Sequence, residues 1–253
     1  MASNRLFEKI CNLCPSYKKN SQLIEQYKNL SSGDKKAYTF AHETIQVDRT
    51  AILNHLIATY DYQDYLEIGI RDGSNLKKII VKNKTSVDPF PIVPCDHEET
   101  SDAFFSRLSS KTQYDLIFID GLHLAEQVYK DVRNALQHLR DKGTIVLHDC
   151  NPPSSFHQRE NYVVDNRQPA WNGTVWKAWA QLRCDSQNLD MVVVDTDWGV
   201  GIIQEGKQER YEEYNEYIYS YEYLEKHRKE LLNLISTDDF LKKYLPTKLV
   251  KEE

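Results

Sequence analysis

The chain has 253 residues, a net charge of −6 and a pI of about 5.8. A chain of this length can bury enough surface to form one large domain without disulfide support. Its acidic balance argues against nonspecific binding to nucleic acid, which needs a basic surface. The N-terminus has no long apolar segment, and no run approaches the ~18 apolar residues of a membrane span. We therefore expect a cytoplasmic protein that does not cross a membrane.

The cysteines favour a reduced compartment. They are odd in number and scattered along the chain, at Cys11, Cys14, Cys95, Cys150 and Cys184. Disulfide frameworks are typical of small secreted chains with paired cysteines. Cys11 and Cys14 form a C-x-x-C pair, but a zinc site would need a second pair of ligands at suitable spacing. We expect two ordinary thiols there.

In chain order, apolar residues first recur at helical spacing from about residue 4 to residue 60, with a turn at 31–34. Short apolar runs then alternate with amphipathic segments. The runs are Tyr65–Ile68, Ser86–Val87, Leu116–Ile119, Thr144–Leu147, Met191–Val194 and Val200–Ile203. Strands that alternate with helices in this way predict a doubly wound α/β fold with a mostly parallel sheet.

The clearest βαβ unit spans residues 115–147. Its two apolar runs have no polar interruption, as is typical of parallel strands that are covered on both faces. Between them, a helix is predicted from Ala125 to Arg140, and Gly143 stands where this helix is expected to end. The apolar stripe of the helix consists of Val128, Val132, Ala135, Leu136 and Leu139.

The last two predicted strands are joined only by residues 195–199, a link too short for a parallel crossover, so they should pair antiparallel. A Tyr- and Glu-rich helix is predicted over 209–235, with six tyrosines between Tyr211 and Tyr223. We expect these rings to pack on the domain or on a neighbouring subunit of a homo-oligomer. The chain is thus divided into an N-terminal helical extension (1–60), a central α/β domain (61–205) and a C-terminal helical segment (206–253).

The ends of the early strands suggest a nucleoside ligand, because open α/β sheets bind ligands beyond the carboxyl ends of their strands. After the first strand, Glu67 offers a carboxylate, and Gly69 and Gly73 let the backbone turn tightly and approach a ligand. Their G-x-x-x-G spacing differs from the G-x-G-x-x-G that seats a pyrophosphate, which disfavours NAD. Asp88 follows the second strand, where a carboxylate commonly holds a ribose diol. These residues predict an adenosine-type ligand.

The third and fourth strands end in two acids and two histidines. Asp120 and His123 follow one strand, and His148 and Asp149 follow the other. Adjacent strands lie ~4.8 Å apart, so these four side chains should share one patch. A histidine there can take a proton from an alcohol nucleophile, and carboxylates with imidazole can also hold a divalent cation.

A resemblance to known proteins is carried by the strings YLEIGIRDGSN, VDP, TSDAFF, DLIFIDGLHLAEQVYKDVRNAL and KGTIVLHDC. Together they resemble class I S-adenosylmethionine-dependent methyltransferases of the "methyltransferase 24" type, and are similar to sugar and macrolide O-methyltransferases. The resemblance covers about residues 60–205. It implies a seven-stranded sheet with an antiparallel last strand, and S-adenosylmethionine as the cofactor.

The resemblance also implies roles for particular residues. Asp120 would lie by the sulfonium, His123 would be the general base, and His148 and Asp149 would line the acceptor site. Relatives that use magnesium bind it through acids matching Asp120 and Asp149, with a further aspartate where this chain has His148. Imidazole suits magnesium poorly, which weighs against metal dependence here. The candidate cofactor residues are Glu67, Gly69, Arg71, Gly73, Ser74, Asp88, Ser101, Asp102 and Asp120.

Two departures from the family pattern concern the cofactor side. Arg71 replaces the usual middle glycine of the first motif. The stretch from Pro89 to Tyr114 is short for a helix, a strand and another helix, so one strand is expected to be rudimentary. Ser101 and Asp102 in this stretch are candidates for contact with the adenine.

Later segments are candidates for the acceptor site. The long polar loop 151–169 is of the kind that often forms a lid. Trp171, Trp176 and Trp179 could stack on a sugar or ring substrate, although the spacing of Trp176 and Trp179 fits the buried face of a helix equally well. Asp195, Asp197 and Trp198 in the last turn are expected either to cap the strands or to form part of the acceptor wall.

The leading hypothesis is methyl transfer from S-adenosylmethionine to a hydroxyl of a sugar, a glycan or another small molecule. A second hypothesis is a cofactor-binding or assembly module without catalytic activity, in which the N-terminal and Tyr-rich segments are interaction surfaces. A third is a metal-dependent hydrolase that uses the two acids and two histidines, against which the pattern from Glu67 to Asp88 counts.

Overall fold

The structure is a computed structural model, and it describes residues 47–164, 166–212 and 218–245. In this part of the chain, a seven-stranded sheet has the order β2-β1-β3-β4-β6-β5-β7. The strands are β1 (Asp64–Ile68), β2 (Asn83–Val87), β3 (Tyr114–Ile119), β4 (Leu139–Leu147), β5 (Leu189–Val194), β6 (Val200–Glu205) and β7 (Leu234–Ile235).

The pairing within the sheet agrees with the predicted fold class. β6 is antiparallel to both of its neighbours, β4 and β5, and every other pair in the sheet is parallel. The doubly wound, mostly parallel sheet is therefore confirmed, as is the antiparallel pairing of β5 with β6. The short edge strand β7 was not predicted, since it has only two residues.

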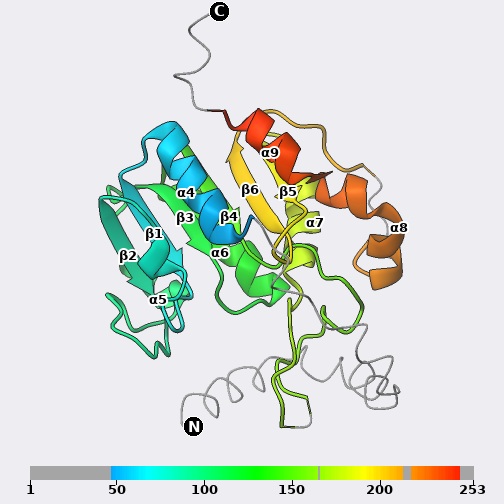
Figure 1. Cartoon of the computed structure of the whole chain (residues 1–253), viewed down its shortest axis with the longest axis horizontal. Coiled ribbons are helices and arrows are strands. Elements are labelled where there is room, and N and C mark those ends of the chain that lie inside the picture. Colours follow the sequence, from blue (N-terminus) through cyan, green and yellow to red (C-terminus); the bar gives the residue numbers. More distant parts are fainter. Residues whose placement is uncertain (1–46, 165, 213–217, 246–253) are drawn as a thin grey trace, which may run out of the picture.

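Helices cover both faces of the sheet (Figure 1). Their bounds are α4 (Arg49–Tyr60), the 3₁₀ helix η3 (Leu76–Lys78), α5 (Ser101–Arg107), α6 (Ala125–Gln137), α7 (Val175–Asp185), α8 (Tyr221–Leu232) and α9 (Thr237–Lys243). Residues of α4 and α9 share one hydrophobic cluster with one face of the sheet, and residues of α5, α6, α7 and α8 share another cluster with the opposite face.

The strands separate these two clusters because successive side chains of a strand point to opposite faces. In β3, Leu116 and Phe118 belong to the cluster of α4 and α9, whereas Ile117 and Ile119 belong to the other cluster. All six residues of β3 are buried, as expected for the uninterrupted apolar run.

The helix predicted from Ala125 to Arg140 is shorter in the structure. α6 ends at Gln137 and β4 begins at Leu139, so Leu139 belongs to a strand and not to the helical stripe. Gly143 lies inside β4 and does not end the helix, so that expectation was wrong. A Cβ at Gly143 would lie 2.9 Å from the carbonyl oxygen of Asp115, so close strand packing explains the glycine.

The strand expected to be rudimentary is reduced to a single bridge. The stretch from Pro89 to Tyr114 contains the helix α5 and one parallel bridge between Val87 and His97. β2 therefore forms the edge of the sheet beside β1.

The Tyr-rich segment is helical only in part. α8 begins at Tyr221, and the described residues 209–212 are not helical, so the predicted helix started too early. Tyr221 is buried, and the hydroxyls of Tyr211 and Tyr223 lie 2.8 Å apart. These rings pack on the domain, as expected, whereas Tyr214 and Tyr217 lie outside the described residues, and the homo-oligomer stays a prediction.

The N-terminal helical region is described only from residue 47. α4 confirms its last part and packs on the sheet through Ile52, Leu53 and Leu56. The expectations for residues 4–46, including Cys11 and Cys14, lie outside the described residues. The division at residues 60 and 205 stays a prediction.

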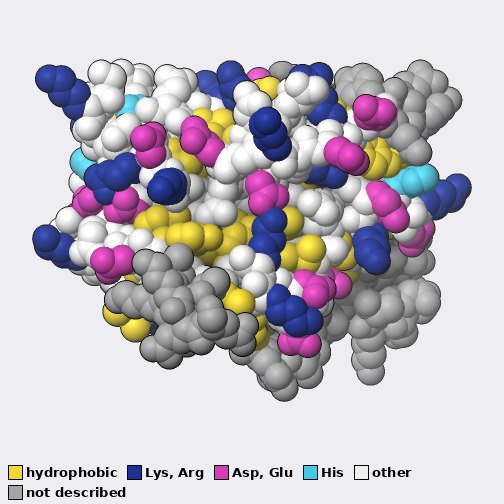
Figure 2. Space-filling view, turned by 90° about the horizontal axis from the view of Figure 1, so that it is seen from above, with side chains coloured by type: hydrophobic (Ala, Val, Ile, Leu, Met, Phe, Trp, Pro, Cys, Tyr) yellow, Lys and Arg dark blue, Asp and Glu magenta, His cyan; other side chains and the backbone are white. Residues whose placement is uncertain are grey.

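Across the described ranges, no helix combines the length and the apolar character that a membrane crossing requires. Seen from above, lysine and arginine side chains are interspersed with aspartate and glutamate side chains (Figure 2). This face therefore offers no broad basic patch of the kind that nucleic acid would need.

Gly69 fixes the approach of two strand ends. Its backbone has φ +91°, and a Cβ there would lie 2.3 Å from the carbonyl oxygen of Asp120. Its N–H donates to the carbonyl of Val87, and the N–H of Asp120 donates to the carbonyl of Ile68, each at 2.8 Å. Only glycine allows the loop after β1 to lie directly against the loop after β3.

We expect Gly69→Ala to lower the free energy of unfolding by at least about 2 kcal/mol, because the new Cβ adds a clash to an unfavourable φ. Denaturant unfolding measures this change. Gly121→Ala is the matched control, because the nearest atom to its Cβ would be 3.6 Å away. Equal effects of the two substitutions would contradict this account of Gly69.

Candidate functional site

Glu67 lies buried at the end of β1, with an exposed fraction of 1%. Its Oε2 accepts hydrogen bonds from the hydroxyl of Tyr65 at 2.6 Å and from Nδ2 of Asn75 at 3.0 Å. Thr50 of α4 in turn donates to Oδ1 of Asn75 at 2.7 Å. Burial raises the pKa of Glu67 to about 7, although both hydrogen bonds act to lower it. Glu67 is thus held rigidly and is close to its titration point at neutral pH.

Asp88 organises the loop that follows β1. Its Oδ2 accepts from the N–H of Arg71 at 2.8 Å, and its Oδ1 accepts from the N–H of Phe90 at 2.7 Å. Arg71 has φ +45°, a left-handed conformation, at the position where a glycine is usual. Asp88 therefore has a clear structural role, and its contact with a ribose stays a prediction.

The other candidate cofactor residues differ in their surroundings. Arg71 and Ser74 are exposed, and the guanidinium of Arg71 lies 6.0 Å from the centre of the Tyr162 ring. Ser101 and Asp102 both accept hydrogen bonds from Gln127 of α6, at 3.2 and 3.1 Å. Because these two side chains connect α5 to α6, the structure adds a packing role to their expected contact with adenine, which stays a prediction.

The structure brings the two acids and two histidines of β3 and β4 together. Nε2 of His123 lies 3.1 Å from Oδ1 of Asp120, and its Nδ1 lies 3.1 Å from Oδ2 of Asp149. Nδ1 of His148 lies 3.1 Å from the same Asp149 oxygen and 3.3 Å from the same Asp120 oxygen. The shared patch that the strand spacing predicted is present.

The two ring nitrogens of His123 face different carboxylates. Its Nε2 lies 3.1 Å from Asp120, and its buried Nδ1 lies 3.1 Å from Asp149 without a well-aligned hydrogen bond. Burial lowers the pKa of His123, but Asp149 and Asp120 outweigh burial, so the pKa is raised. The imidazole side chain is 16% exposed. Two carboxylates therefore orient an imidazole that is itself only partly exposed.

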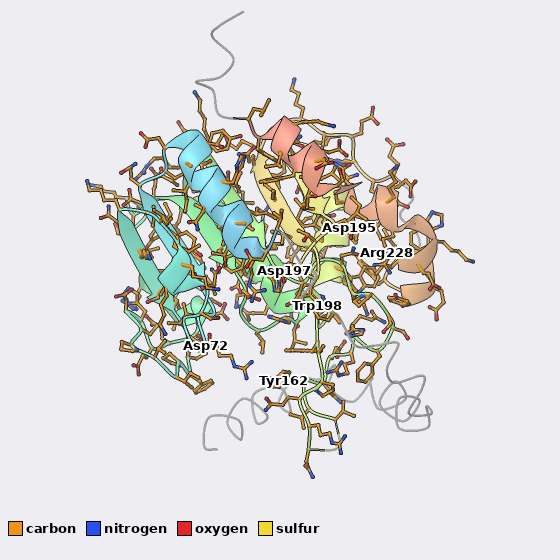
Figure 3. The ribbon with its side chains drawn as sticks, viewed as in Figure 1. Asp72, Tyr162, Asp195, Asp197, Trp198 and Arg228 are labelled. Atoms are coloured by element: carbon orange, nitrogen blue, oxygen red, sulfur yellow. The ribbon has the colours of Figure 1, made fainter. Side chains whose placement is uncertain are left out.

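The cluster also includes Arg49, to which sequence reasoning gave no role, and Asp197, which was only a candidate cap or part of the acceptor wall. Arg49, in the first turn of α4, donates from Nη1 to Oδ2 of Asp197 at 3.1 Å and contacts Nε2 of His148 at 2.9 Å. Asp197 lies in the β5–β6 turn, close to the start of α4 (Figure 3). The turn was expected to cap strands or to form the acceptor wall, and its acid was a visible signal. Arg49 offered no such signal, because it is 148 residues away from Asp197.

Burial strongly affects the charges of this cluster. The pKa of Asp120 is lowered far below its usual range because His148, His123 and Arg49 together outweigh the effect of burial. The pKa of Asp197 is lowered for the same reason, with His148 and Arg49 as its partners. Burial lowers the pKa of His148, whereas Asp149 and Asp120 raise it, and their effect prevails. Asp120 and Asp197 are therefore ionised at neutral pH.

An aromatic layer lies beside His123. The ring of Trp171 stacks on the imidazole at 5.0 Å with an interplanar angle of 17°, and Tyr162 of the long polar loop lies 5.2 Å from the Trp171 ring. Trp176 and Trp179 are fully buried in α7, so for these two the packing alternative is correct. Of the three tryptophans, only Trp171 is still a candidate for contact with a substrate.

The same cluster contains a candidate metal group. One ligand atom each of Asp120, His123 and Asp149 lies within 4.8 Å of the others. The imidazole in this set suits Mn²⁺ or Zn²⁺ better than Mg²⁺, which prefers oxygen ligands. His148 already lies between the two carboxylates, and Nε of Arg49 is 3.9 Å from Oδ2 of Asp120. These positive and donor groups compete with a cation for the same oxygens, so the fit is poor.

Part of the chain matches one family model. Residues 72–150 match the model of a family described as a methyltransferase domain. This segment contains Asp88 and the four clustered residues of β3 and β4. No curated protein matches the sequence of this chain.

Similar solved structures include three proteins of low sequence identity. A cofactor-bound structure of Rv0187 from MTB is 13% identical, with a TM-score of 0.48, over 70% of this chain and 88% of that chain. The SAH-bound methyltransferase PaMTH1 of Podospora anserina is 14% identical, with a TM-score of 0.48, over 81% and 96%. An O-methyltransferase from Bacillus cereus in complex with SAH is 13% identical, with a TM-score of 0.44, over 73% and 91%.

The raised pKa of Glu67 predicts a pH dependence of stability. Between its ordinary value of 4.5 and about 7, the native carboxyl keeps a proton that the unfolded chain has lost. The free energy of unfolding should therefore fall as pH rises through this window, by about 3 kcal/mol if ~1.4 kcal/mol corresponds to each pKa unit.

Glu67→Gln should remove this contribution, because the amide does not titrate. Urea unfolding of both proteins at a series of pH values measures the difference in slope. Identical slopes for the variant and the wild type would contradict the buried, protonated state of Glu67.

Proposed function

We propose that this chain is an S-adenosylmethionine-dependent methyltransferase that methylates a hydroxyl oxygen. The observation that carries the proposal is that the candidate cofactor residues after β1 and the candidate base after β3 lie next to each other at the same end of the sheet. Gly69, at the nucleoside end, is packed against the backbone of Asp120, whose side chain holds the candidate base His123. The family match over residues 72–150 supports the same reaction class.

The residues at the ends of β1 and β2 suit the cofactor. Glu67 is a buried carboxylate for the ammonium end of the ligand, Gly69 leaves room for close approach, and Asp88 supplies a ribose acceptor. Asp120 offers an ionised carboxylate to a sulfonium. When bound, S-adenosylmethionine supplies an electrophilic methyl group. The chain's part is then to align the reactants and to remove a proton.

His123 is the proposed general base. Asp120 holds the imidazole at Nε2, and the partly exposed ring is the part of the cluster that the acceptor hydroxyl would meet. Asp149, at 3.1 Å from Nδ1, stabilises the imidazolium that forms. A carboxylate that orients an imidazole and stabilises its charge is a recurring arrangement in enzymes that activate hydroxyl groups.

The proposed acceptor is a sugar, a glycan or another small molecule with a hydroxyl group. Trp171 and Tyr162 place aromatic rings next to His123, and such rings can pack against the apolar face of a sugar or against a planar ligand. The exposed Arg71 near Tyr162 adds a hydrogen-bond donor on the same side.

Calorimetry with S-adenosylmethionine, with and without EDTA, tests the reaction class. Binding that is insensitive to EDTA supports the proposal, and the absence of binding by the full chain would refute it. A mass-spectrometric search for products that gain a methyl group, among sugars and small hydroxylated compounds, then identifies the acceptor. Cofactor binding without any product would favour a module without catalytic activity, and hydrolysis that depends on metal would favour a hydrolase.

His123→Ala should lower turnover by roughly 10²- to 10⁴-fold, because it removes the proton acceptor. The Kd of S-adenosylmethionine should stay within a fewfold of that of the wild type, since the residues at the ends of β1 and β2 are unchanged. Steady-state kinetics and calorimetry on the same preparation separate the two effects.

Asp88→Asn provides the contrasting variant. It keeps the size of the side chain, but an amide nitrogen cannot accept, so one of the two hydrogen bonds from the N–H groups of Arg71 and Phe90 is lost. It should weaken cofactor binding more than it changes turnover at saturating cofactor.

If the His123→Ala variant keeps normal turnover, His123 is not part of the mechanism.

A further inference from the structure

Arg49 lies among the three acids of the cluster. Its backbone N–H and its Nη1 both donate to Asp197, at 2.9 and 3.1 Å, and Nη1 lies 2.9 Å from Nε2 of His148. Its Nε is 3.9 Å from Oδ2 of Asp120. The guanidinium therefore connects the turn between β5 and β6 with the ends of β3 and β4.

The place of Arg49 in its own helix is unfavourable for a positive charge. It is the first residue of α4, and the first turn of a helix favours acidic side chains over basic ones. No acidic side chain occupies that first turn. The position is thus explained by contacts outside the helix, above all by Asp197, and not by any preference of the helix.

His148 lies between Arg49 and the acids. Its Nε2 is 2.9 Å from Nη1 of Arg49, and its Nδ1 faces the oxygens of Asp149 and Asp120 at 3.1 and 3.3 Å. Arg49 and His148 therefore both occupy positions beside the carboxylates that a divalent cation would need.

We propose that Arg49 is the resident cation of this site and that, through it, the protein excludes a divalent metal from Asp120, His123 and Asp149. Arg49 supplies a permanent positive charge beside Asp120 and orients His148 between the carboxylates. It is a positioning residue, since its contacts in the structure are with side chains of the cluster. The inference concerns metal binding, and its test does not depend on the methyltransfer reaction.

The test is Mn²⁺ binding to the full chain, measured by the loss of the free-ion signal in electron paramagnetic resonance. Arg49→Ala should bind one Mn²⁺ per chain at this site, because the repelling charge is gone. The wild type and Arg49→Lys, which both keep the charge, should bind Mn²⁺ there at least roughly tenfold more weakly. Adding Asp149→Asn to Arg49→Ala should abolish the new binding.

Arg140→Ala is the matched control. Arg140 also pairs with two carboxylates, those of Asp64 and Asp115, but at another place in the sheet. Its removal should create no Mn²⁺ site. Arg49→Met, which keeps much of the side-chain volume, replaces Arg49→Ala if the smaller variant fails to fold.

Three results would overturn the inference. The first is a wild-type protein that binds Mn²⁺ as tightly as Arg49→Ala does and loses it on Asp149→Asn. The second is an Arg49→Ala or Arg49→Met protein that folds but binds no Mn²⁺. The third is an equal gain of Mn²⁺ binding in Arg140→Ala, which would mean that any exposed acid pair suffices. A failure of S-adenosylmethionine binding, by contrast, would affect only the proposed function.

Discussion

The burial of three carboxylates at one end of the sheet is the constraint on which the rest of the site depends. The side chains of Asp120, Asp149 and Asp197 are only 18%, 6% and 4% exposed. Buried charges of one sign are tolerated only if partners compensate them, and removing a partner costs about 3–5 kcal/mol. Here the partners are Arg49 and the two imidazoles. The network therefore holds α4, the ends of β3 and β4, and the β5–β6 turn in one arrangement.

The backbone around this network is correspondingly unusual. Asp149, Asp197 and Trp198 have φ values of +62°, +42° and +66°. A left-handed conformation is uncommon for residues other than glycine, and most of all for a bulky tryptophan. Such positions are kept where surrounding contacts over-determine them. Asn172 is one such contact, because its Nδ2 donates to Asp149 at 2.9 Å. The orientation of the acidic side chains is thus fixed by the local backbone conformation as well as by their hydrogen-bond and ion-pair partners.

The sequence predicted what depends on local pattern. Uninterrupted apolar runs located the inner strands, and the rule that ligands bind at strand ends was enough to bring Asp120 and Asp149 together. Sequence reasoning failed where a local pattern had two meanings. Leu139 continues an apolar helical stripe, but it belongs to β4, because strand pairing with Tyr114 takes precedence over helical spacing. The role of Arg49 could not be predicted, because its partner Asp197 is distant in sequence and no local signal connects them.

The charges of the site also explain why one cluster can serve both ends of the proposed reaction. Transfer of a methyl group from a sulfonium to a neutral hydroxyl forms a C–O bond, breaks a C–S bond and releases a proton. One positive charge thus disappears at sulfur and appears on the proton acceptor.

In the proposed reaction, Asp120 would face the positive charge before and after this transfer. Its Oδ1 holds His123, and its Oδ2 faces Arg49, whose permanent charge keeps the carboxylate ionised. If His123 takes the proton, as proposed, the new charge would lie between Asp120 and Asp149, which are already in place. On this proposal, the field that favours the sulfonium would also favour the imidazolium, so the dipoles and charges of the site would need little reorganisation during the reaction.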